Sequence, residues 1–304
     1  MTDLTATERL MSLLDLDGDP EARTDEDIYV GYSPDAVHPR VFGGQVLGQS
    51  VVAASRTVAE ERQIHSLHGY FLRPGDIRKP ITFGVQRLRD GRSFSARRVH
   101  AYQDGVPILS MIASFEVHAR GVEHQMPFPE NIPDPESLPS ASEFLKRIDH
   151  PLAAEWRDNR PFDFRYIDEP IFFNPAADPE AGTTVWIKTK DKLPADTPQA
   201  VHRAALAYAS DYTLLESILR RHKLKWTTRG MNIASLDHAM WWHRPVAVDE
   251  WMLYVQESPS ASEARGLGTG RIFSRNGELL ATVAQEGMIR MPEFGDSEDQ
   301  ATGE

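Results

Sequence analysis

Apolar and polar positions in the first third of the chain predict a buried helix followed by an antiparallel sheet. The segment 42–55, FGGQVLGQSVVAAS, carries no charged residue, which is typical of a helix buried on nearly all sides. Downstream, polar and apolar residues alternate as in strands, interrupted by the turn sequences RDGR (89–92) and QDGV (103–106). Nearer the N-terminus, Thr5 and Glu8 form a capping-box pattern that predicts a short amphipathic helix.

The same kinds of element recur after residue 161. Strand patterns resume there, residues 197–222 predict one long amphipathic helix, and further strand patterns follow it. The dipeptide RP at 73 recurs at 244, and QDGVPILSMIAS matches RNGELLATVAQE at nearly the same offset. We therefore expect an internal duplication in which each half wraps a curved antiparallel sheet around one apolar helix. A sheet shared by the two halves would hide two strand edges.

These patterns divide the chain into four parts. Seven prolines interrupt the segment 119–161, which we interpret as a connector without any helix longer than ASEFLKRI (141–148). The expected parts are an N-terminal domain at 1–118, this connector, a C-terminal domain at 162–292 and an acidic tail at 293–304.

Composition and charge limit the classes of function. The 304 residues are 40% hydrophobic and 26% charged, as in a folded, water-soluble protein. With 45 acidic and 33 basic residues the formal net charge is −12, so we expect no nucleic-acid partner. The chain has no cysteine, no run near the ~20 apolar residues of a membrane span, and no signal-peptide pattern at its start. We therefore expect a cytoplasmic protein without a membrane span.

Several motifs could suggest a cofactor or a metal, but each fits a structural interpretation better. GLGTGR (266–271) lies among strands and opens no helix, so we interpret it as a flexible or bulged strand rather than a dinucleotide site. The segment 15–26 has acids at EF-hand spacing, but Pro20 replaces the glycine that such a loop needs. Arg97 and Arg98 could form a phosphate-contacting patch, but neighbours on a strand face opposite ways, so at most one points into any site, and we favour a solvated strand face. We therefore expect no metal and no cofactor.

One carboxylate has an unusual place on the predicted helix 197–222. Asp211 shares a helical face with Tyr208, Leu215 and Ile218, and burying an unpaired carboxylate costs several kcal/mol. It must therefore find hydrogen-bond donors or be tuned for chemistry. The matching helix of the first half contains no acid, so the fold itself does not require one. Asp211 is therefore a candidate catalytic residue.

Two histidines are weaker candidates. His68 and His238 lie in aromatic-rich strand patterns and could act as general bases by residue type alone. A hydrogen-bonded structural histidine is the commoner outcome at such positions. The neighbouring Trp241 and Trp242 are expected to pack rather than to hold a cofactor.

Several segments, in this order, make the chain resemble the type II acyl-CoA thioesterases. They include HPRVFGGQVLGQSVVAASRTV (38–58), IHSLHGYFLRPGD (64–76), ASDYTLL (209–215), ASLDHAMWWHRP (234–245) and LATVAQEGMIR (280–290). The resemblance implies an α+β fold of two tandem hotdog domains, a double hotdog, in one polypeptide. It also implies hydrolysis of medium- to long-chain fatty acyl-CoA to free fatty acid and coenzyme A, which is part of the substrate and not a separate cofactor. Family members associate, so a homo-oligomer is expected.

The resemblance also implies the catalytic residues. The family's aspartate on the second hotdog helix, its hydroxyl at the start of the following strand and its glutamine on the last strand fall on Asp211, Ser235 and Gln285. The aspartate could accept a proton from a water that Ser235 and Gln285 position. It could instead attack the thioester itself and form an anhydride, and the sequence leaves both routes open.

Substrate contacts are expected from the other half. Gly43 and Gly44 open its apolar helix, where free backbone N–H groups suit a developing oxyanion. His68 is a further expected substrate contact.

Two other classes of protein were weighed. A hotdog protein can bind or sense acyl-CoA without turnover, but the complete set Asp211, Ser235 and Gln285 argues against this alternative. A hotdog hydratase generally pairs its aspartate with a histidine five residues later, where this chain has Glu216, so we discount it.

Overall fold

The first half of the chain folds as one central helix and an antiparallel sheet. The computed structural model describes residues 4–18, 26–172, 174–176, 178 and 182–291. The elements of the first half are α1 (Ala6–Leu14), β1 (Asp17–Gly18), β2 (Asp27–Gly31), α2 (Gly43–Ser55), β3 (Arg62–Phe71), β4 (Ile81–Asp90), β5 (Phe94–Gln103) and β6 (Val106–Val117).

Local sequence signals explain how these elements begin and turn. The predicted capping box is confirmed, because the Glu8 N–H donates to the Thr5 hydroxyl and the Thr5 N–H donates to the Glu8 carboxylate. The two predicted hairpins are confirmed as the β4–β5 and β5–β6 pairs. At the second turn Asp104 and Gly105 have φ angles of 51° and 74°, the left-handed backbone that an Asp-Gly hairpin turn requires.

The predicted connector contains a helix that the sequence analysis missed. Its elements are η1 (Pro135–Ser137), α3 (Ala141–Leu145) and α4 (Pro151–Asn159). The prediction of no helix longer than ASEFLKRI is wrong, because Pro151 begins α4 instead of interrupting it. Proline is favoured at the first helical position, where an N–H has no intrahelical partner in any case. His150 caps this helix by accepting a hydrogen bond from the Leu152 N–H.

The second half repeats the plan of the first. Its elements are β7 (Phe162–Tyr166), β8 (Thr183–Thr189), α5 (Gln199–Ser210), α6 (Glu216–Arg221), β9 (Asn232–Ser235), β10 (Asp237–Trp242), β11 (Met252–Ser262), β12 (Arg265–Ser274) and β13 (Leu279–Arg290).

The predicted helix at 197–222 is two helices rather than one. Between α5 and α6 the Glu216 N–H bonds to the Thr213 carbonyl, three residues back, instead of continuing the α-helical pattern. The Ser210 carbonyl accepts a hydrogen bond from the Tyr254 hydroxyl at 3.1 Å. Asp211 is therefore the C-cap residue of α5 and not a member of a mid-helix stripe.

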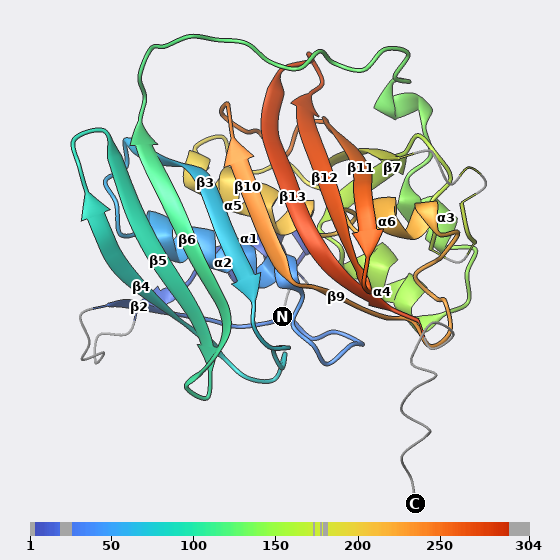
Figure 1. Cartoon of the computed structure of the whole chain (residues 1–304), viewed down its shortest axis with the longest axis horizontal. Helices are drawn as coiled ribbons and strands as arrows, with labels where there is room; N and C mark the ends of the chain where they lie inside the picture. The colour runs from blue at the N-terminus through green and yellow to red at the C-terminus, as the bar shows by residue number, and fades with distance from the viewer. Residues whose placement is uncertain (1–3, 19–25, 173, 177, 179–181, 292–304) are drawn as a thin grey trace, which may run out of the picture.

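Within the described residues, both halves share one thirteen-stranded sheet. Its order is β1-β2-β4-β5-β6-β3-β10-β13-β12-β11-β8-β7, and β9 pairs with β13. At the centre β3 and β10 pair antiparallel and join the halves. On either side the order is mirrored, with β6, β5 and β4 beyond β3 and β13, β12 and β11 beyond β10 (Figure 1). The predicted α+β double hotdog with a shared sheet is confirmed.

The two central helices pack against each other on one face of this sheet, where α1 also lies (Figure 1). α2 and α5 run antiparallel, with Gly44 facing Tyr208 and Gly48 facing Ala204. A Cβ on Gly44 would lie 2.3 Å from the Tyr208 carbonyl oxygen, so only glycine permits this approach. The contact brings the N-terminus of α2 to the C-terminus of α5.

The GLGTGR segment is a strand, part of β12, as predicted, and it pairs in continuous register with β13. On its other side the register with β11 shifts between Glu257 and Ser260, opposite Thr269 and Leu267, so the irregularity lies in that ladder. Gly266, Gly268 and Gly270 alternate onto the buried face of the sheet. A Cβ on Gly266 would lie 2.7 Å from the Ile218 side chain, and one on Gly268 would lie 2.8 Å from the Leu214 carbonyl oxygen. The glycines therefore let α6 and the turn before it lie directly on the sheet.

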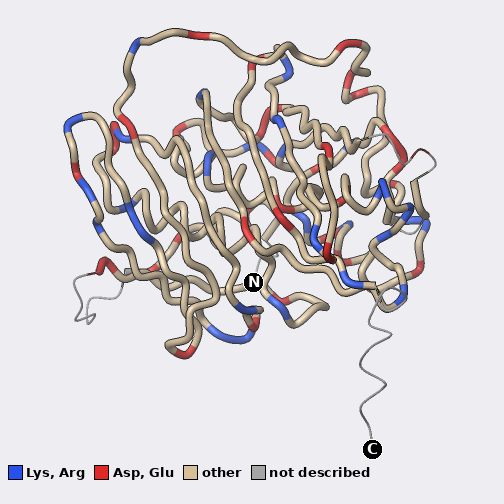
Figure 2. The backbone as a smooth tube through the Cα atoms, viewed as in Figure 1, with Lys and Arg blue, Asp and Glu red and all other residues tan. Residues whose placement is uncertain are grey.

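Charged residues are distributed over the described chain, and Figure 2 shows Lys and Arg positions interspersed with Asp and Glu. Arg97 departs from the predicted solvated strand face, because it is only 1% exposed. Its guanidinium bonds to the hydroxyl and carbonyl of Thr57 and to the Asp90 carboxylate, which ties the end of α2 to β5. In the described part of the chain, no helix is both long and apolar enough to span a membrane.

Candidate active site

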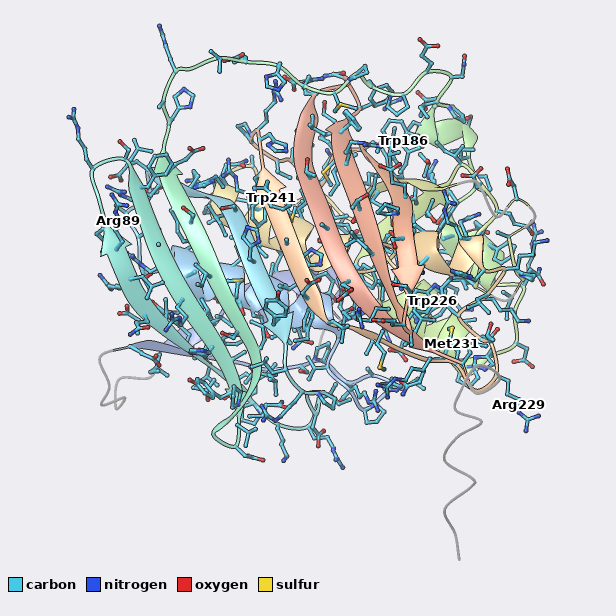
Figure 3. The ribbon with its side chains drawn as sticks, in the orientation of Figure 1. Arg89, Trp186, Trp226, Arg229, Met231 and Trp241 are labelled. Carbon is cyan, nitrogen blue, oxygen red and sulfur yellow. The ribbon has the colours of Figure 1, made fainter. Side chains whose placement is uncertain are left out.

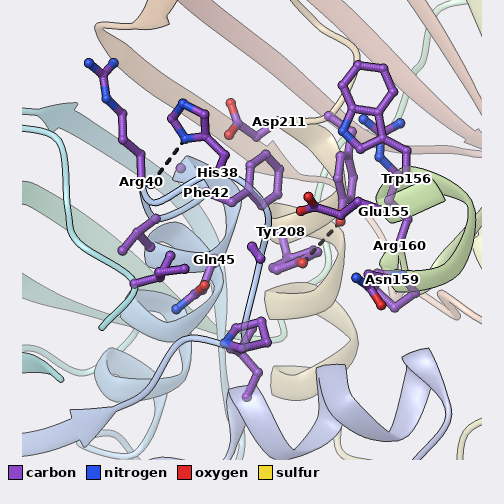
Figure 4. A pocket seen from close by; sticks show the side chains of 18 of the residues that line it. His38, Arg40, Phe42, Gln45, Glu155, Trp156, Asn159, Arg160, Tyr208 and Asp211 are labelled. Atoms are coloured by element: carbon purple, nitrogen blue, oxygen red, sulfur yellow. Dashed lines mark hydrogen bonds between the residues drawn. The ribbon is translucent and has the colours of Figure 1, made fainter. Parts of the chain in front are cut away.

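A pocket of about 800 Å³ lies where the two halves meet. Residues of α1, the loop before α2, the start of α2, α4, the end of α5 and β9 line it. Figure 4 shows Asp211 beside Phe42, with His38 and Arg40 on one side and Trp156 on the other. Its volume falls within the range of small-molecule sites, about 300–1,000 Å³.

Three polar side chains from three elements meet at this pocket: Asp211 and Ser235 line it, and Gln285 is buried beside them. Asp211 lies at the end of α5, Ser235 at the end of β9 and Gln285 within β13. The Gln285 Nε2 donates to Asp211 Oδ1 at 2.8 Å and to Ser235 Oγ at 2.5 Å. The Ser235 hydroxyl lies 3.4 Å from Asp211 Oδ1. The structure thus brings together the three catalytic candidates from the sequence.

Burial raises the pKa of Asp211 to about 6. Hydrogen bonds from Gln285, from the Gly44 backbone and from Ser235 lower the pKa and offset only part of this effect. The carboxylate also stands at the C-terminus of α5, where the helix dipole disfavours negative charge. Asp211 is therefore ionised at neutral pH and yet more basic than an exposed carboxylate, which suits a general base.

The two candidate glycines lie beside this carboxylate. A Cβ on Gly43 would lie 2.8 Å from Asp211 Oδ2, so a larger residue would crowd the carboxylate. α2 begins after Phe42, whose side chain makes no capping hydrogen bond. Its first N–H groups therefore receive no capping acceptor from the N-cap side chain and can meet groups from elsewhere in the fold. The Gly44 N–H is directed to Asp211, whose pKa it lowers.

His238 lies behind Gln285 and not in the pocket wall. Its side chain is fully buried, with Nδ1 at 2.8 Å from Gln285 Oε1 and Nε2 at 3.0 Å from Ser210 Oγ. Burial lowers the pKa of His238 to about 4, so the ring is neutral at physiological pH. These contacts agree with the interpretation of His238 as a hydrogen-bonded structural histidine rather than a general base. The sequence did not signal that its partner is Gln285, because the contact depends on the pairing of β10 with β13.

His68 lies away from the site. On β3 it is exposed on the outer face of the sheet, whereas its neighbour Leu67 is fully buried on the inner face. Its ring packs edge-on against Trp241 of β10, with 5.1 Å between ring centroids, and Figure 3 labels Trp241 near the middle of the sheet. Since the structure does not bring His68 to Asp211, we do not retain it as a substrate contact.

Aromatic rings and one arginine form a pocket wall that the sequence analysis missed. Phe42 stacks on Tyr212 with 4.5 Å between centroids and meets Tyr208 edge-on at 5.2 Å. The Arg160 guanidinium lies 4.5 Å from the Trp156 ring and 4.7 Å from the Tyr212 ring. Trp156 and Arg160 come from α4 and its end, inside the segment interpreted as a connector. One sequence signal could have predicted α4, namely Pro151 at the start of PLAAEW (151–156), because proline is favoured at the first position of a helix.

Among the described residues, no three His, Asp or Glu side chains lie close enough together to bind a metal ion. Pro20 of the acidic segment 15–26 lies outside the described residues, as does the predicted tail at 293–304.

Comparisons with known proteins agree with this geometry. The sequence model described as "Acyl-CoA thioesterase" matches residues 165–288, and that described as "Acyl-CoA thioesterase N-terminal domain" matches residues 33–116. Acyl-CoA thioesterase 2 of Haemophilus influenzae is 39% identical over 277 residues, which are 89% of this chain and 95% of that protein. Acyl-coenzyme A thioesterase 8 of Homo sapiens is 35% identical over 285 residues, 90% of this chain and 88% of that protein.

Solved structures lead to the same family. The crystal structure of an acyl-CoA thioesterase II from Mycobacterium marinum is 39% identical, with a TM-score of 0.73 over 95% of this chain and 99% of that one. A hot dog protein from Alicyclobacillus acidocaldarius, only 20% identical, has a TM-score of 0.76 over 94% of this chain and 99% of that one, and supports the fold alone. From sequence identity, coverage and fold together, the chain belongs to the type II acyl-CoA thioesterase family.

Proposed function

We propose that this chain hydrolyses the thioester of acyl-CoA in the pocket at Asp211, with the carboxylate as general base. The observation that carries this proposal is the hydrogen-bonded set of Asp211, Gln285 and Ser235, which opens into a pocket large enough for an acyl chain. The names of the relatives, acyl-CoA thioesterases, support the choice of substrate.

The proposed reaction needs no covalent intermediate. Asp211 takes a proton from a water molecule as the water oxygen bonds to the thioester carbonyl carbon and the carbonyl π electrons move to oxygen. The C–S bond then breaks, and the departing thiolate takes the proton from Asp211. The products are free acid and coenzyme A, and the carboxylate is restored.

Gln285 and Ser235 have different tasks in this proposal. Both N–H groups of Gln285 are engaged, one with Asp211 and one with Ser235, so the amide fixes their relative positions. Because Ser235 Oγ accepts from Gln285, its own proton is available to the attacking water or to Asp211. Holding water and carbonyl in register removes much of the entropic cost of reaction.

The developing oxyanion is assigned to the start of α2. With the Gly44 N–H directed to Asp211, the Gly43 N–H is the first-turn donor that we propose for the carbonyl oxygen. A backbone donor at a helix N-terminus is already oriented before the charge develops, which is the source of its effect in catalysis.

Medium- to long-chain fatty acyl groups are the proposed substrates. The pocket extends from Asp211 past Phe42 and Tyr208 to Leu10 and Leu13 of α1, which offer an apolar lining to a chain of methylene groups. A panel of acyl-CoA esters of graded length, assayed for thiol release, tests this proposal. Activity confined to acetyl-CoA would contradict it.

The assay for the reaction itself is thiol release from acyl-CoA by the wild type, by Asp211→Asn and by Asp196→Asn. Asp196 is exposed and does not line the pocket, so its variant is a matched control that should keep activity. Binding of acyl-CoA without thiol release by the wild type would instead support the alternative of a non-catalytic binding or sensing protein.

The anhydride route has its own test. A single turnover in oxygen-18 water should put the label in the fatty acid and leave none in Asp211. Label recovered in the Asp211 side chain would contradict water activation and show that Asp211 attacks the thioester as a nucleophile.

A cytoplasmic homo-oligomer stays a prediction. Light scattering of the purified protein tests its association, and a mass equal to one 34.2 kDa chain would contradict it.

A further inference from the structure

The orientation of the Gln285 amide decides whether the catalytic carboxylate meets a donor or an acceptor. An amide group has nearly the same shape when it is turned by 180°, so packing alone does not fix which atom faces Asp211. With Nε2 toward Asp211 Oδ1 the 2.8 Å contact is a charge-assisted hydrogen bond. With Oε1 in that place, the same distance would set two acceptors against each other while Asp211 is ionised.

The oxygen of the Gln285 amide, which points away from Asp211, contacts the imidazole ring of His238. Gln285 is itself fully buried, and its Oε1 lies 2.8 Å from Nδ1 of the fully buried His238. We propose that His238 is a positioning residue for catalysis, which donates its Nδ1–H to Gln285 Oε1 and thereby keeps the amide NH₂ group directed at Asp211 and Ser235. This inference rests on the proposed function of Asp211 and adds to it the group that orients its partner.

The second ring nitrogen leaves two consistent hydrogen-bond chains. His238 Nε2 lies 3.0 Å from Ser210 Oγ, which in turn lies 2.9 Å from the Ala207 carbonyl oxygen. If Nδ1 carries the proton, Nε2 accepts from the Ser210 hydroxyl, whose proton then turns from the Ala207 carbonyl oxygen to the ring. If Nε2 carries it, Nε2 donates to Ser210, which then donates to Ala207, and Nδ1 needs a donor from Gln285.

Only the first chain fits an ionised Asp211. In the second chain the Gln285 NH₂ group turns to His238, so its carbonyl oxygen faces the Asp211 carboxylate at 2.8 Å. That arrangement also removes the donor from Ser235 Oγ. The tautomer of His238 and the orientation of Gln285 are therefore coupled, and the Nδ1–H tautomer is the one compatible with the base form of the site.

The surroundings keep both groups in these forms. Burial lowers the pKa of His238, so one ring nitrogen carries a proton and the other accepts at neutral pH. The buried ionisable groups near Asp211 are phenols whose pKa values burial raises, so they are neutral as well: Tyr208 of α5, Tyr212 of the following turn and Tyr254 of β11. Of the cationic side chains that line the pocket, Arg160 lies over the Tyr212 ring, and Arg40 is exposed, as is His38.

Nitrogen-15 NMR of histidine-labelled wild-type protein at pH 7.5 tests the tautomer directly. We expect a neutral His238 ring protonated at Nδ1, with the signal assigned by its loss in His238→Asn. A ring protonated at Nε2 would overturn the proposal. This measurement needs no substrate, so it decides the point even if the wild type proved unable to hydrolyse acyl-CoA.

Two isosteric variants separate the hydrogen bond from the packing of the ring. His238→Asn keeps an N–H donor near the position of Nδ1, whereas His238→Leu has the same branched shape without a donor. We expect His238→Leu to lose about 10- to 100-fold in kcat with KM little changed, by analogy with the loss when a hydrogen-bond partner that orients a metal ligand is removed. His238→Asn should recover most of that activity.

The pH profile adds a readout that a purely structural role would not move. The Gln285 hydrogen bond lowers the pKa of Asp211, so a freely turning amide should shift the acid limb of kcat/KM to higher pH in His238→Leu. Equal losses in both variants, or an unshifted limb in a folded His238→Leu, would overturn the proposal. If His238→Leu does not fold, two results test the proposal instead. The wild-type ring must be protonated at Nδ1, and the acid limb of kcat/KM in His238→Asn must stay at the wild-type pH, because asparagine keeps the donor to Gln285.

Discussion

Replacing Asp211 with asparagine should stabilise the protein at neutral pH while it abolishes catalysis. Burial holds the pKa of this carboxyl at about 6 in the folded protein, against an ordinary value of 3.8. One pKa unit corresponds to about 1.4 kcal/mol, so keeping Asp211 ionised at pH 7.5 costs the folded state about 3 kcal/mol. Asparagine has nearly the same size and remains neutral, so it should relieve most of this cost.

Lost hydrogen bonds offset part of the gain. The carboxylate accepts from Gln285 on one oxygen and is approached by the Gly44 N–H, whereas asparagine offers only one oxygen. Leaving one buried donor without an acceptor costs about 1–2 kcal/mol. The free energy of unfolding should therefore rise by about 1–2 kcal/mol in Asp211→Asn.

The raised pKa also fixes the pH window of the effect. Between about pH 4 and pH 6 the folded protein retains a proton on Asp211 that the unfolded chain has released. Wild-type stability from this group therefore falls as the pH rises through that window. Asparagine binds no proton, so the difference between variant and wild type should be small near pH 4.5 and reach its full size above about pH 7.

Urea unfolding followed by circular dichroism at pH 5 and pH 7.5 measures both the gain and its pH dependence. Asp196→Asn, at an exposed position, is the matched control and should change stability at neither pH. A variant less stable than wild type at pH 7.5, or a gain of equal size at both pH values, would refute the reasoning that burial holds Asp211 in an unfavourable ionised state.

Three further predictions concern the same site. The wild-type kcat/KM for acyl-CoA should rise with pH, with an apparent pKa near 6 for the acid limb of the profile. An acid limb with an apparent pKa near 4 would show that burial does not raise the pKa of Asp211. Gly44→Ala should lower the free energy of unfolding by about 1–3 kcal/mol in urea titrations, because its Cβ would lie 2.3 Å from a backbone oxygen. A Cβ at Gly43 would meet only side chains, the Asp211 carboxylate at 2.8 Å and the Phe71 ring at 3.0 Å, so Gly43→Ala should lose kcat with a smaller loss of stability. Equal stability of the two variants would contradict this. Trp156→Ala should reduce kcat/KM more for long than for short acyl-CoA because it removes part of the pocket wall, and an equal reduction across the panel would exclude a role in chain binding.

Much of the fold could be predicted because its signals are local. The capping box at Thr5, the Asp-Gly hairpin turn at Gly105 and the charge-free helix at 42–55 each depend on a few neighbouring residues, and the structure contains all three. The duplicated order of elements predicted a shared sheet, since two halves with exposed edges gain by pairing them. The absence of an acid from the first helix marked Asp211 before any coordinates were known.

Other features depended on residues far apart in the chain. The predicted long helix breaks at Asp211, where β11 supplies the Tyr254 hydroxyl to the last carbonyl of α5. The glycines of GLGTGR indicated a flexible strand until the structure placed α6 against them. The wall at Trp156 came from a segment whose prolines suggested a connector, because one proline can either begin a helix or interrupt it.

By itself, the sequence determined most of the elements, their duplication and the choice of Asp211 as the candidate carboxylate, since these follow from periodicity, turn chemistry and the cost of burying a charge. The tertiary structure alone decided the state of that carboxylate. Its raised pKa, the donors on Oδ1 and the ring of His238 behind Gln285 arise from β9, β10, β13 and the start of α2 meeting at the end of α5. Hydrogen bonds and desolvation act over a few ångströms in space, whatever the distance along the chain.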